Sequence, residues 1–405
     1  MKFNKPTNKN ERKDEVVDIN SSEATAIQYC DSLILDAILK GASDIHIEPF
    51  SKLVSIRYRI DGKLKRIDEL SLVRYPSILA RFKIMAEMNI AERRIPQDGK
   101  IRYTKDDIDY DLRVSTIPTI HGEKIVVRIY SHDFTSSDIS SLGFSDEQKE
   151  LIISMITRSH GIILLTGPTG SGKSTTLYTF LRYLAKEDIN IMTIEDPVEN
   201  EIVGINQVQV NPKTNLTFAT ALRSFLRQDP NIIMIGEIRD EETAQIATRA
   251  AITGHLVLSS IHTNDAASVV ARLVNMGIPK YLVADSLLGA ISQRLVRKLC
   301  HKCKVSKMTN ATEMQLLQLN EPAKIFEPIG CPNCNNTGYH GRIGVFEIMV
   351  LTDEIKGIIM SDDFTSEKIA TAVEKNMPTI LKNTRERVLR GETSIEEYEQ
   401  FVDIV

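Results

Sequence analysis

The stretch Gly161–Leu177, GIILLTGPTGSGKSTTL, decides the fold of this chain. It begins with the apolar run Ile162–Leu165, which is short enough for a buried strand. A helix-like segment, Thr175–Leu184, begins within this stretch and continues beyond it. Between them lies a match to G-x-x-x-x-G-K-[ST] at every fixed position, made by Gly167, Pro168, Thr169, Gly170, Ser171, Gly172, Lys173 and Ser174. A strand, a glycine loop and a helix in this order form the context that a phosphate-binding loop requires.

The residue types of this loop suit the binding of a nucleotide. Glycines allow the backbone to curl until several N–H groups face one anion. The following helix adds the positive end of its dipole. We expect Lys173 to reach the terminal phosphates and the Ser174 hydroxyl to hold Mg²⁺, with Thr175 at the helix start also in the nucleotide site. The alternative is a glycine-rich turn without a ligand, which does not need Lys and Ser in register.

Length and composition limit the class of protein. The 405 residues favour two domains. A net charge of −4 argues against a basic nucleic-acid binder. No apolar run approaches the ~18 residues of a membrane span, and the polar N-terminus lacks the core of a signal peptide. We therefore predict a cytoplasmic protein that reaches a membrane only through a partner. The five cysteines indicate metal binding or catalysis rather than disulfides.

The first third of the chain reads as a small α/β domain. Residues 1–20 are polar and charged, as in a mobile tail. An amphipathic helix fits Glu23–Lys40, and the alternating residues of Leu53–Ile60 before Asp61-Gly62 predict a strand and a hairpin turn. Further elements are expected at a strand around Ile45–Ile47, a helix at Pro76–Met88 and strands at Ile101–Tyr103, Tyr110–Ser115 and Lys124–Tyr130. The predicted domain spans residues 21–132, and residues 133–141 form a Ser-rich linker.

From residue 142 to 405 the pattern changes to buried strands that alternate with helices. The strand candidates are nearly continuous apolar runs, as expected for parallel strands covered on both faces: Ile162–Leu165, Asn190–Ile194, Ile232–Ile235 and Leu256–Ser260. This indicates a doubly wound P-loop ATPase core, with C-terminal helices.

Two of these strands end in carboxylates. Glu237 follows Ile232–Ile235 in the arrangement of a Walker B acid, and we expect it to hold Mg²⁺ directly or through water. Glu195 and Asp196 end the strand at residues 190–194. One of them is the candidate base that deprotonates the attacking water, and we favour Glu195. Residue type and position do not separate the two, and an acidic turn before Pro197 is the structural alternative.

Histidine and arginine side chains complete the catalytic candidates. His262 follows the strand Leu256–Ser260 and can sense the γ-phosphate, for which it is better placed than His255 at the other end of that strand. Arginines stabilise the charge that develops in phosphoryl transfer. The candidates are two pairs, Arg223 with Arg227 on one helix face and Arg113 with Arg128 on strands of the small domain. For each of them a solvated surface charge is the alternative.

Four of the five cysteines form two C-x-x-C pairs, Cys300–Cys303 and Cys331–Cys334. Four thiolates in this arrangement predict a closed tetrahedral zinc site, structural rather than catalytic. Residues 304–330 then form an insert between the two knuckles, in a zinc subdomain at about residues 296–345. A pair of redox-active dithiols is the alternative. The isolated Cys30 is expected to be a buried apolar residue.

With these residues assembled, the chain resembles the secretion ATPases of type II secretion and type IV pilus assembly. The resemblance covers Ala42 to the C-terminus. It rests on segments in the family's order: ASDIHIEP, RYRIDG, AERRIPQDG, DLRVST, GEKIVVRIY, GPTGSGKSTTLY, TIEDPVE, LRQDPNIIMIGEIRDEETA, ITGHLVLSSIHTNDA and GRIGVFE.

The resemblance implies ATP as the nucleotide and a homohexameric ring of RecA-like ATPase domains, in which each PAS-like N-terminal domain closes over a neighbour's nucleotide. It implies that Glu195 is the general base and Glu237 the Walker B acid. It also implies that five arginines line the phosphate site, namely Arg113, Arg128, Arg223, Arg227 and Arg342. The tetracysteine pairs resemble those of assembly ATPases. Large members of the family carry a further N-terminal docking domain, a role for which the helix at Glu23–Lys40 is the candidate substitute here.

The function that follows is that of a cytoplasmic motor, peripheral at the inner membrane. It would turn a platform protein that adds pilin-like subunits to a fibre, in secretion, pilus extension or DNA uptake. A nucleic-acid translocase is the rival from another class, against which stands the absence of a basic, aromatic-studded stretch. A zinc-stabilised scaffold without turnover conflicts with the complete set of acids.

Overall fold

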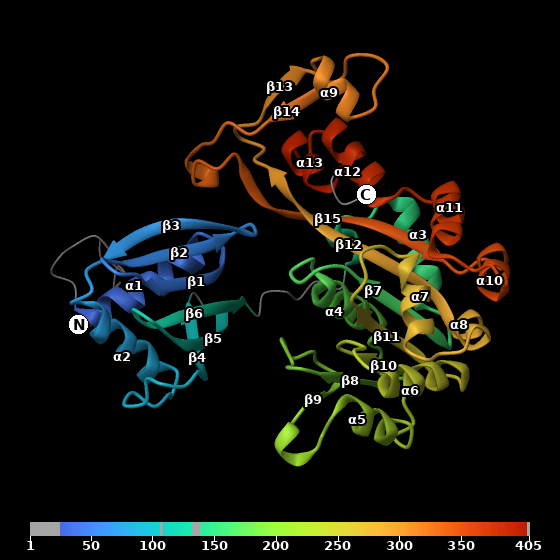
Figure 1. Cartoon of the computed structure of the whole chain (residues 1–405), viewed down its shortest axis with the longest axis horizontal. Helices are drawn as coiled ribbons and strands as arrows, with labels where there is room; N and C mark the ends of the chain where they lie inside the picture. Colours follow the sequence, from blue (N-terminus) through green and yellow to red (C-terminus); the bar gives the residue numbers. More distant parts are fainter. Residues whose placement is uncertain (1–24, 106–107, 132–137, 403–405) are drawn as a thin grey trace, which may run out of the picture. The chain divides into compact units, whose positions relative to one another are not determined.

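The structure is a computed structural model that describes residues 25–105, 108–131 and 138–402 (Figure 1). The chain divides into two compact units, Met1–Asp133 and Phe134–Val405. The predicted tail and residues 133–137 of the predicted linker lie outside the described residues. The end of that linker belongs to the second unit, because Ile139–Leu142 form a 3₁₀ turn and Ile139 is buried in its core.

The first unit is an antiparallel six-stranded sheet in the order β3-β2-β1-β6-β5-β4. Its strands are β1 (Ala42–Pro49), β2 (Val54–Ile60), β3 (Lys63–Leu70), β4 (Gln97–Lys105), β5 (Ile108–Thr119) and β6 (Gly122–Ser131). The predicted hairpin turn is present, with φ of 48° at Asp61 and 84° at Gly62. The sequence pattern did not predict strand β3, because it is a charged edge strand with little apolar periodicity.

Two helices, α1 (Ala26–Leu39) and α2 (Tyr75–Met85), cover one face of this sheet. Helix α1 buries Tyr29, Cys30 and Leu33 against the strands, so its apolar face belongs to the core of the first unit. As predicted, Cys30 is a buried residue, and desolvation raises its pKa to about 12.

The second unit is built on a seven-stranded sheet in the order β15-β12-β7-β11-β10-β8-β9. All neighbouring strands are parallel except β15, which pairs antiparallel with β12 at one edge. The strands are β7 (Gly161–Thr166), β8 (Ile191–Glu195), β9 (Asn206–Gln209), β10 (Ile232–Ile235), β11 (Leu256–Ile261), β12 (Leu287–Leu299) and β15 (Tyr339–Val350). The predicted α/β core is therefore confirmed.

Helices pack on both faces of this sheet, as its apolar strands require. The two cores separate by alternation along β7, with Ile162 in one and Ile163 in the other. One face carries α3 (Asp146–Ile156) and α4 (Lys173–Leu184). The other carries α5 (Phe218–Phe225), α6 (Glu241–Ile252), α7 (Ser268–Asn275), α8 (Lys280–Ser286), α10 (Asp353–Met360) and α11 (Ser366–Asn376).

An insert follows β12 and packs on the C-terminal helices. It contains β13 (Val305–Met308), α9 (Ala311–Leu316) and β14 (Lys324–Glu327), and the C-terminal helices are α12 (Ile380–Leu389) and α13 (Ile395–Val402). Leu317 and Ile325 of the insert share a small core with Val388 and Tyr398. Of the helices in the described ranges, none combines the length and the apolar character of a membrane span.

A buried ion pair in the first unit yields a stability prediction. The Lys83 and Glu123 side chains are 1% and 3% exposed, with Nζ 2.6 Å from Oε1. Lys83→Met leaves the carboxylate buried without its cation, so we expect it to cost about 3–5 kcal/mol, whereas the double variant Lys83→Met/Glu123→Met recovers most of the loss. Hydrogen exchange of the β1 and β6 amides in the full chain measures this. Equal protection in the single variant and the wild type would contradict it.

Candidate functional site

The predicted phosphate loop connects β7 to α4 at the carboxyl edge of the parallel sheet. Its backbone takes left-handed conformations at Gly167 and Gly172, with φ of 143° and 90°. A Cβ on Gly167 would lie 2.4 Å from the Gln293 backbone oxygen and 2.8 Å from Ser171 Oγ, so only glycine fits there. The loop is thus pressed against β12.

Two loop side chains are arranged for an anion. Lys173 Nζ donates to the backbone oxygens of Gly167 (2.8 Å) and Pro168 (3.0 Å), which holds the ammonium over the loop. Burial lowers the pKa of Lys173, Glu237 opposes that shift, and Arg294 adds to it. Ser171 Oγ is buried without a hydrogen-bond partner among the described residues. A buried hydroxyl and a desolvated cation in one loop fit the oxygens of a phosphate.

Glu199, in the segment that follows β8, lies next to Ser174 in the first turn of α4. The sequence analysis did not single out this carboxylate as a site residue. Ser174 Oγ donates to Glu199 Oε1 over 3.3 Å. A hydroxyl and a carboxylate side by side are the hard oxygen donors that Mg²⁺ prefers. The residues present therefore fit a magnesium ion, with Ser174 and Glu199 as neighbours of its position.

The predicted base Glu195 ends β8 and is only 4% exposed. Thr193 Oγ1 (2.6 Å) and Gln207 Nε2 (3.1 Å) donate to its Oε1, and the Tyr178 hydroxyl donates to its Oε2. Tyr178 in turn accepts the backbone N–H of Glu199 over 3.1 Å. Both oxygens of Glu195 are thus engaged, and the network runs from Glu195 through Tyr178 to Glu199. Asp196, by contrast, is exposed.

The Walker B candidate Glu237 lies just beyond β10, next to the end of β11. His262 Nε2 is 3.1 Å from Glu237 Oε2, and the Arg239 guanidinium donates to Oε1. Burial raises the pKa of Glu237, but Arg239 and His262 outweigh this and lower it, so the carboxylate stays ionised. His255 lies at the opposite end of β11, where its backbone oxygen accepts from Gly161.

The predicted arginines of the second unit lie at the surface. Arg223 on α5 pairs with Glu242 of α6, and Arg227 donates to the Arg223 backbone oxygen. Arg342 is an exposed residue of β15, opposite Arg297 of β12. Among the described residues, no hydrogen bond joins these three predicted arginines to the phosphate loop, so their nucleotide roles stay predictions.

The two arginines of the first unit face each other across β5 and β6. Arg113 and Arg128 are register partners, so their side chains emerge on one face of the sheet. Arg128 Nε donates to Asp44 Oδ1 (2.9 Å), which raises the pKa of the arginine, and Arg113 stacks on the Tyr130 ring. They form a cationic pair on a scaffold that is separate from the phosphate loop.

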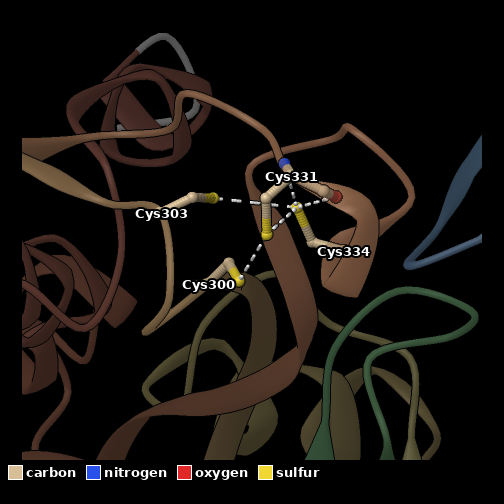
Figure 2. Close-up of side chains that lie close together, drawn as sticks. All are labelled: Cys300, Cys303, Cys331 and Cys334. Atoms are coloured by element: carbon tan, nitrogen blue, oxygen red, sulfur yellow. Dashed lines mark hydrogen bonds between the residues drawn. The ribbon is translucent and has the colours of Figure 1, made fainter.

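The four cysteines of the two C-x-x-C pairs converge, and their sulfurs lie within 4.8 Å of one another (Figure 2). The Cys300–Cys331, Cys303–Cys334 and Cys331–Cys334 sulfurs are 3.9, 3.8 and 3.8 Å apart. A zinc ion with Zn–S bonds of about 2.3 Å needs a tetrahedral edge of about 3.8 Å. Three of the sulfur pairs therefore have the spacing that a zinc site requires, and the four cysteines are free thiols rather than disulfides.

Backbone groups prepare the sulfurs for this charge. The N–H groups of Cys331 and Gly338 each donate to Cys334 Sγ over 3.2 Å. Although desolvation raises the pKa of Cys334, these bonds and the neighbouring thiols lower it to about 6. Donors around a metal-binding sulfur are the outer shell expected of a structural site.

Four residues near the phosphate loop were missed by sequence reasoning: Tyr178, Glu199, Gln293 and Arg294. Glu199 lies four residues beyond the end of β8, so its position does not mark it as a strand-end acid. Gln293 and Arg294 lie in β12, which the periodicity did not single out as a strand. The pair of polar residues inside an apolar run, ISQRLV, was the available signal.

A protein-family model described as type II/IV secretion system protein matches residues 20–400. The chain is 46% identical over 379 residues to the type IV pilus assembly ATPase PilB of Thermus thermophilus, covering 93% of this chain and 43% of that protein. It is 44% identical over 380 residues to the type II secretion system ATPase E of Vibrio cholerae, covering 93% and 75%. A second PilB, from Acinetobacter baylyi, is 46% identical and is covered over 66% of its length. The chain thus spans less than two thirds of both PilB relatives.

Solved structures show the same fold. The Legionella pneumophila ATPase DotB superimposes with a TM-score of 0.71 at 21% identity, covering 95% of this chain and 98% of that one. The pilus retraction motor PilT with bound ADP gives 0.60 at 24% identity, covering 91% and 95%. None of these relatives is named as a nucleic-acid translocase, so that alternative gains no support.

The metal centre yields a composition test. We expect one zinc per chain in the wild type by elemental analysis, and a loss of nearly all of it in Cys331→Ser, because three thiolates no longer close the tetrahedron. Cys30→Ser is the matched control, since Cys30 is buried in the first unit and far from the cluster in the sequence. Equal zinc in Cys331→Ser and wild type would disprove the site.

Proposed function

The chain belongs to the type II/IV secretion system protein family, and from this premise we propose that it binds Mg²⁺–ATP and hydrolyses it to power fibre assembly. The fibre is a pilus or pseudopilus, as in the systems for which its relatives are named. One observation carries the proposal. A phosphate loop, a magnesium-type donor pair and a held Walker B carboxylate meet at the carboxyl ends of β7, β8 and β10.

Binding is the work of the loop and of α4. The N–H groups among residues 169–173 and the helix N-terminus would hold the phosphates, whose oxygens compete for Lys173 with the loop carbonyls that accept from it. Ser174 and Glu237 are the residues that would hold Mg²⁺, which when bound neutralises charge on the phosphate oxygens.

Hydrolysis needs a carboxylate that accepts a proton from water as the water attacks the γ-phosphorus and the bond to ADP breaks. Glu195 and Glu199 are the candidates. Glu199 is partly exposed and contacts Ser174 in the first turn of α4, whereas Glu195 is buried and both of its oxygens accept hydrogen bonds. We propose that Glu199 takes the proton and that Glu195 positions it through Tyr178, since the tyrosine hydroxyl accepts the Glu199 N–H. His262, bound to Glu237, would report loss of the γ-phosphate.

The motor part of the proposal concerns partners. We propose a ring of six copies in which Arg113 and Arg128 reach a nucleotide, with Arg223, Arg227 and Arg342 as further phosphate contacts. The ring would act at the cytoplasmic face of the inner membrane on a platform protein that adds pilin-like subunits. The zinc centre favours an assembly motor within the family, because that is the branch that the tetracysteine pairs resemble. Secretion, pilus extension and DNA uptake all remain possible outputs.

The two glutamates differ in their expected kinetic phenotypes. We expect Glu199→Gln to bind ATP like the wild type and to lower kcat by about 10²-fold or more, because general-base catalysis is removed. Glu195→Gln, which keeps the shape but upsets the bonds from Tyr178 and Thr193, should lower kcat less. Steady-state hydrolysis and nucleotide titration measure both effects.

Tyr178→Phe tests the link from Glu195 to Glu199, because it removes the hydroxyl that binds both residues while it keeps both carboxylates in the chain. If Glu195→Gln abolishes turnover while Glu199→Gln leaves it normal, Glu195 is the base and the assignment above is wrong. If both variants hydrolyse ATP at the wild-type rate, neither glutamate is the base.

The output of the motor is tested in a deletion strain rescued by wild type or Glu199→Gln, with surface pili, DNA uptake and exported proteins scored together. Loss of pili or uptake, unrescued by the variant, identifies a pilus or competence motor. Loss of export alone identifies a secretion motor. No loss in any of the three would contradict the proposed function.

A further inference from the structure

A buried arginine stands behind the phosphate loop. Arg294 lies in β12, two residues beyond Ser292, which pairs with Thr166 at the end of β7. Its position is therefore level with the loop itself. The side chain is 8% exposed, and a Cβ on Gly167 would lie 3.0 Å from its Nη1. The guanidinium thus touches the back of the loop, on the side away from solvent.

This buried charge has no acidic partner at close range. Its hydrogen bonds go to backbone oxygens, from Nη1 to Gln293 (3.1 Å) and from Nη2 to Asn264 (2.7 Å). Across the described ranges of the chain, Arg294 forms no ion pair. Burial lowers the pKa of Arg294, and the carboxylates of Glu347 and Asp265 offset only part of that shift. A buried charge without a counter-ion is costly, and a protein that retains one needs a compensating interaction.

The neighbouring charges indicate what supplies that interaction. Lys173 lies on the same loop, and its pKa is lowered in part by Arg294, so the two cations repel each other across the loop. Ser171 Oγ, 2.8 Å from the same Cβ position on Gly167, is buried without a partner. An anion in the loop would be attracted by both cations and would remove their mutual repulsion. Polyphosphate is the anion that the loop is shaped to hold.

Arg294 also connects the loop to the strand end that carries His262. It holds the Asn264 oxygen, which Ser292 Oγ also contacts at 3.3 Å. One position earlier, the Thr263 N–H and oxygen bind the Thr166 hydroxyl at the start of the loop. One guanidinium therefore spans the phosphate loop and the segment after β11.

We infer that Arg294 is a positioning residue whose buried charge strengthens the binding of the nucleotide's phosphates from behind the loop. The inference rests on the proposed function, because it takes ATP as the ligand. It does not require contact between the guanidinium and the phosphate. Arg294 acts through the loop backbone and through the electrostatic field in a poorly hydrated site, where charges act more strongly than in water.

The test compares Arg294→Met, Arg294→Lys and the surface control Arg249→Met in the full chain. The probes are ATP and inorganic pyrophosphate, each titrated by calorimetry. We expect Arg294→Met to raise the Kd of both by about tenfold or more, because the shared phosphates carry the effect. Arg294→Lys should recover most of the affinity, since it keeps the charge. Arg249 is an exposed residue of α6, and its variant should bind like the wild type.

Thermal melting without nucleotide separates this role from a structural one. Arg294→Met should melt at or above the wild-type temperature, because it removes an unpaired buried charge and Ser292 still contacts the Asn264 oxygen. A lower melting temperature with unchanged Kd values would overturn the inference. So would equal loss of affinity in the Lys and Met variants. A wild type that binds ATP while Arg294→Met binds it equally well refutes only this inference, whereas a wild type that binds neither probe refutes the proposed function.

Discussion

The close packing of the phosphate loop against β12 is the constraint on which the rest of the second unit depends. At Gly167 the space behind the backbone is filled by the Gln293 oxygen and the Arg294 guanidinium, so a side chain cannot be accommodated. The loop can lie there only because β12 is the immediate neighbour of β7 in the sheet. On this support, the backbone oxygens of Gly167 and Pro168 hold the Lys173 ammonium against the loop. The sheet order therefore determines the shape of the phosphate site.

The parallel register determines the chemistry around that site. Because β8, β10 and β11 run in the same direction as β7, the polar residues that follow them meet at one edge. The acids at this edge differ in their burial and in the groups that they contact. Glu195 is enclosed and saturated with hydrogen bonds, Glu237 is held ionised by Arg239 and His262, and Glu199 remains beside Ser174. Three glutamates of one chemical type therefore differ in burial and in hydrogen-bond partners.

The cysteine cluster belongs to an insert that is too small to form a hydrophobic core of its own. The segment between the two cysteine pairs contributes few buried residues, and Leu317 and Ile325 among them share a core with residues of α12 and α13. The four clustered sulfurs lie where the ends of this segment meet the long strands β12 and β15. A metal bound by them would stabilise the insert through ligand bonds, in addition to its limited apolar burial.

The sequence by itself determined the α/β class, the phosphate loop and the cysteine cluster. Each of these is specified by local spacing, either an apolar run of strand length or fixed intervals between Gly, Lys, Ser or Cys. It also placed Glu237 and His262 at strand ends, and the structure brings them into contact. Only the tertiary structure decided which acid is enclosed and which lies next to Ser174, because Glu195 and Glu199 differ in their contacts rather than in type. The charged edge strand β3 and the buried Arg294 were likewise beyond the pattern. An edge strand lacks apolar alternation, and the role of a buried charge depends on neighbours that are distant in sequence.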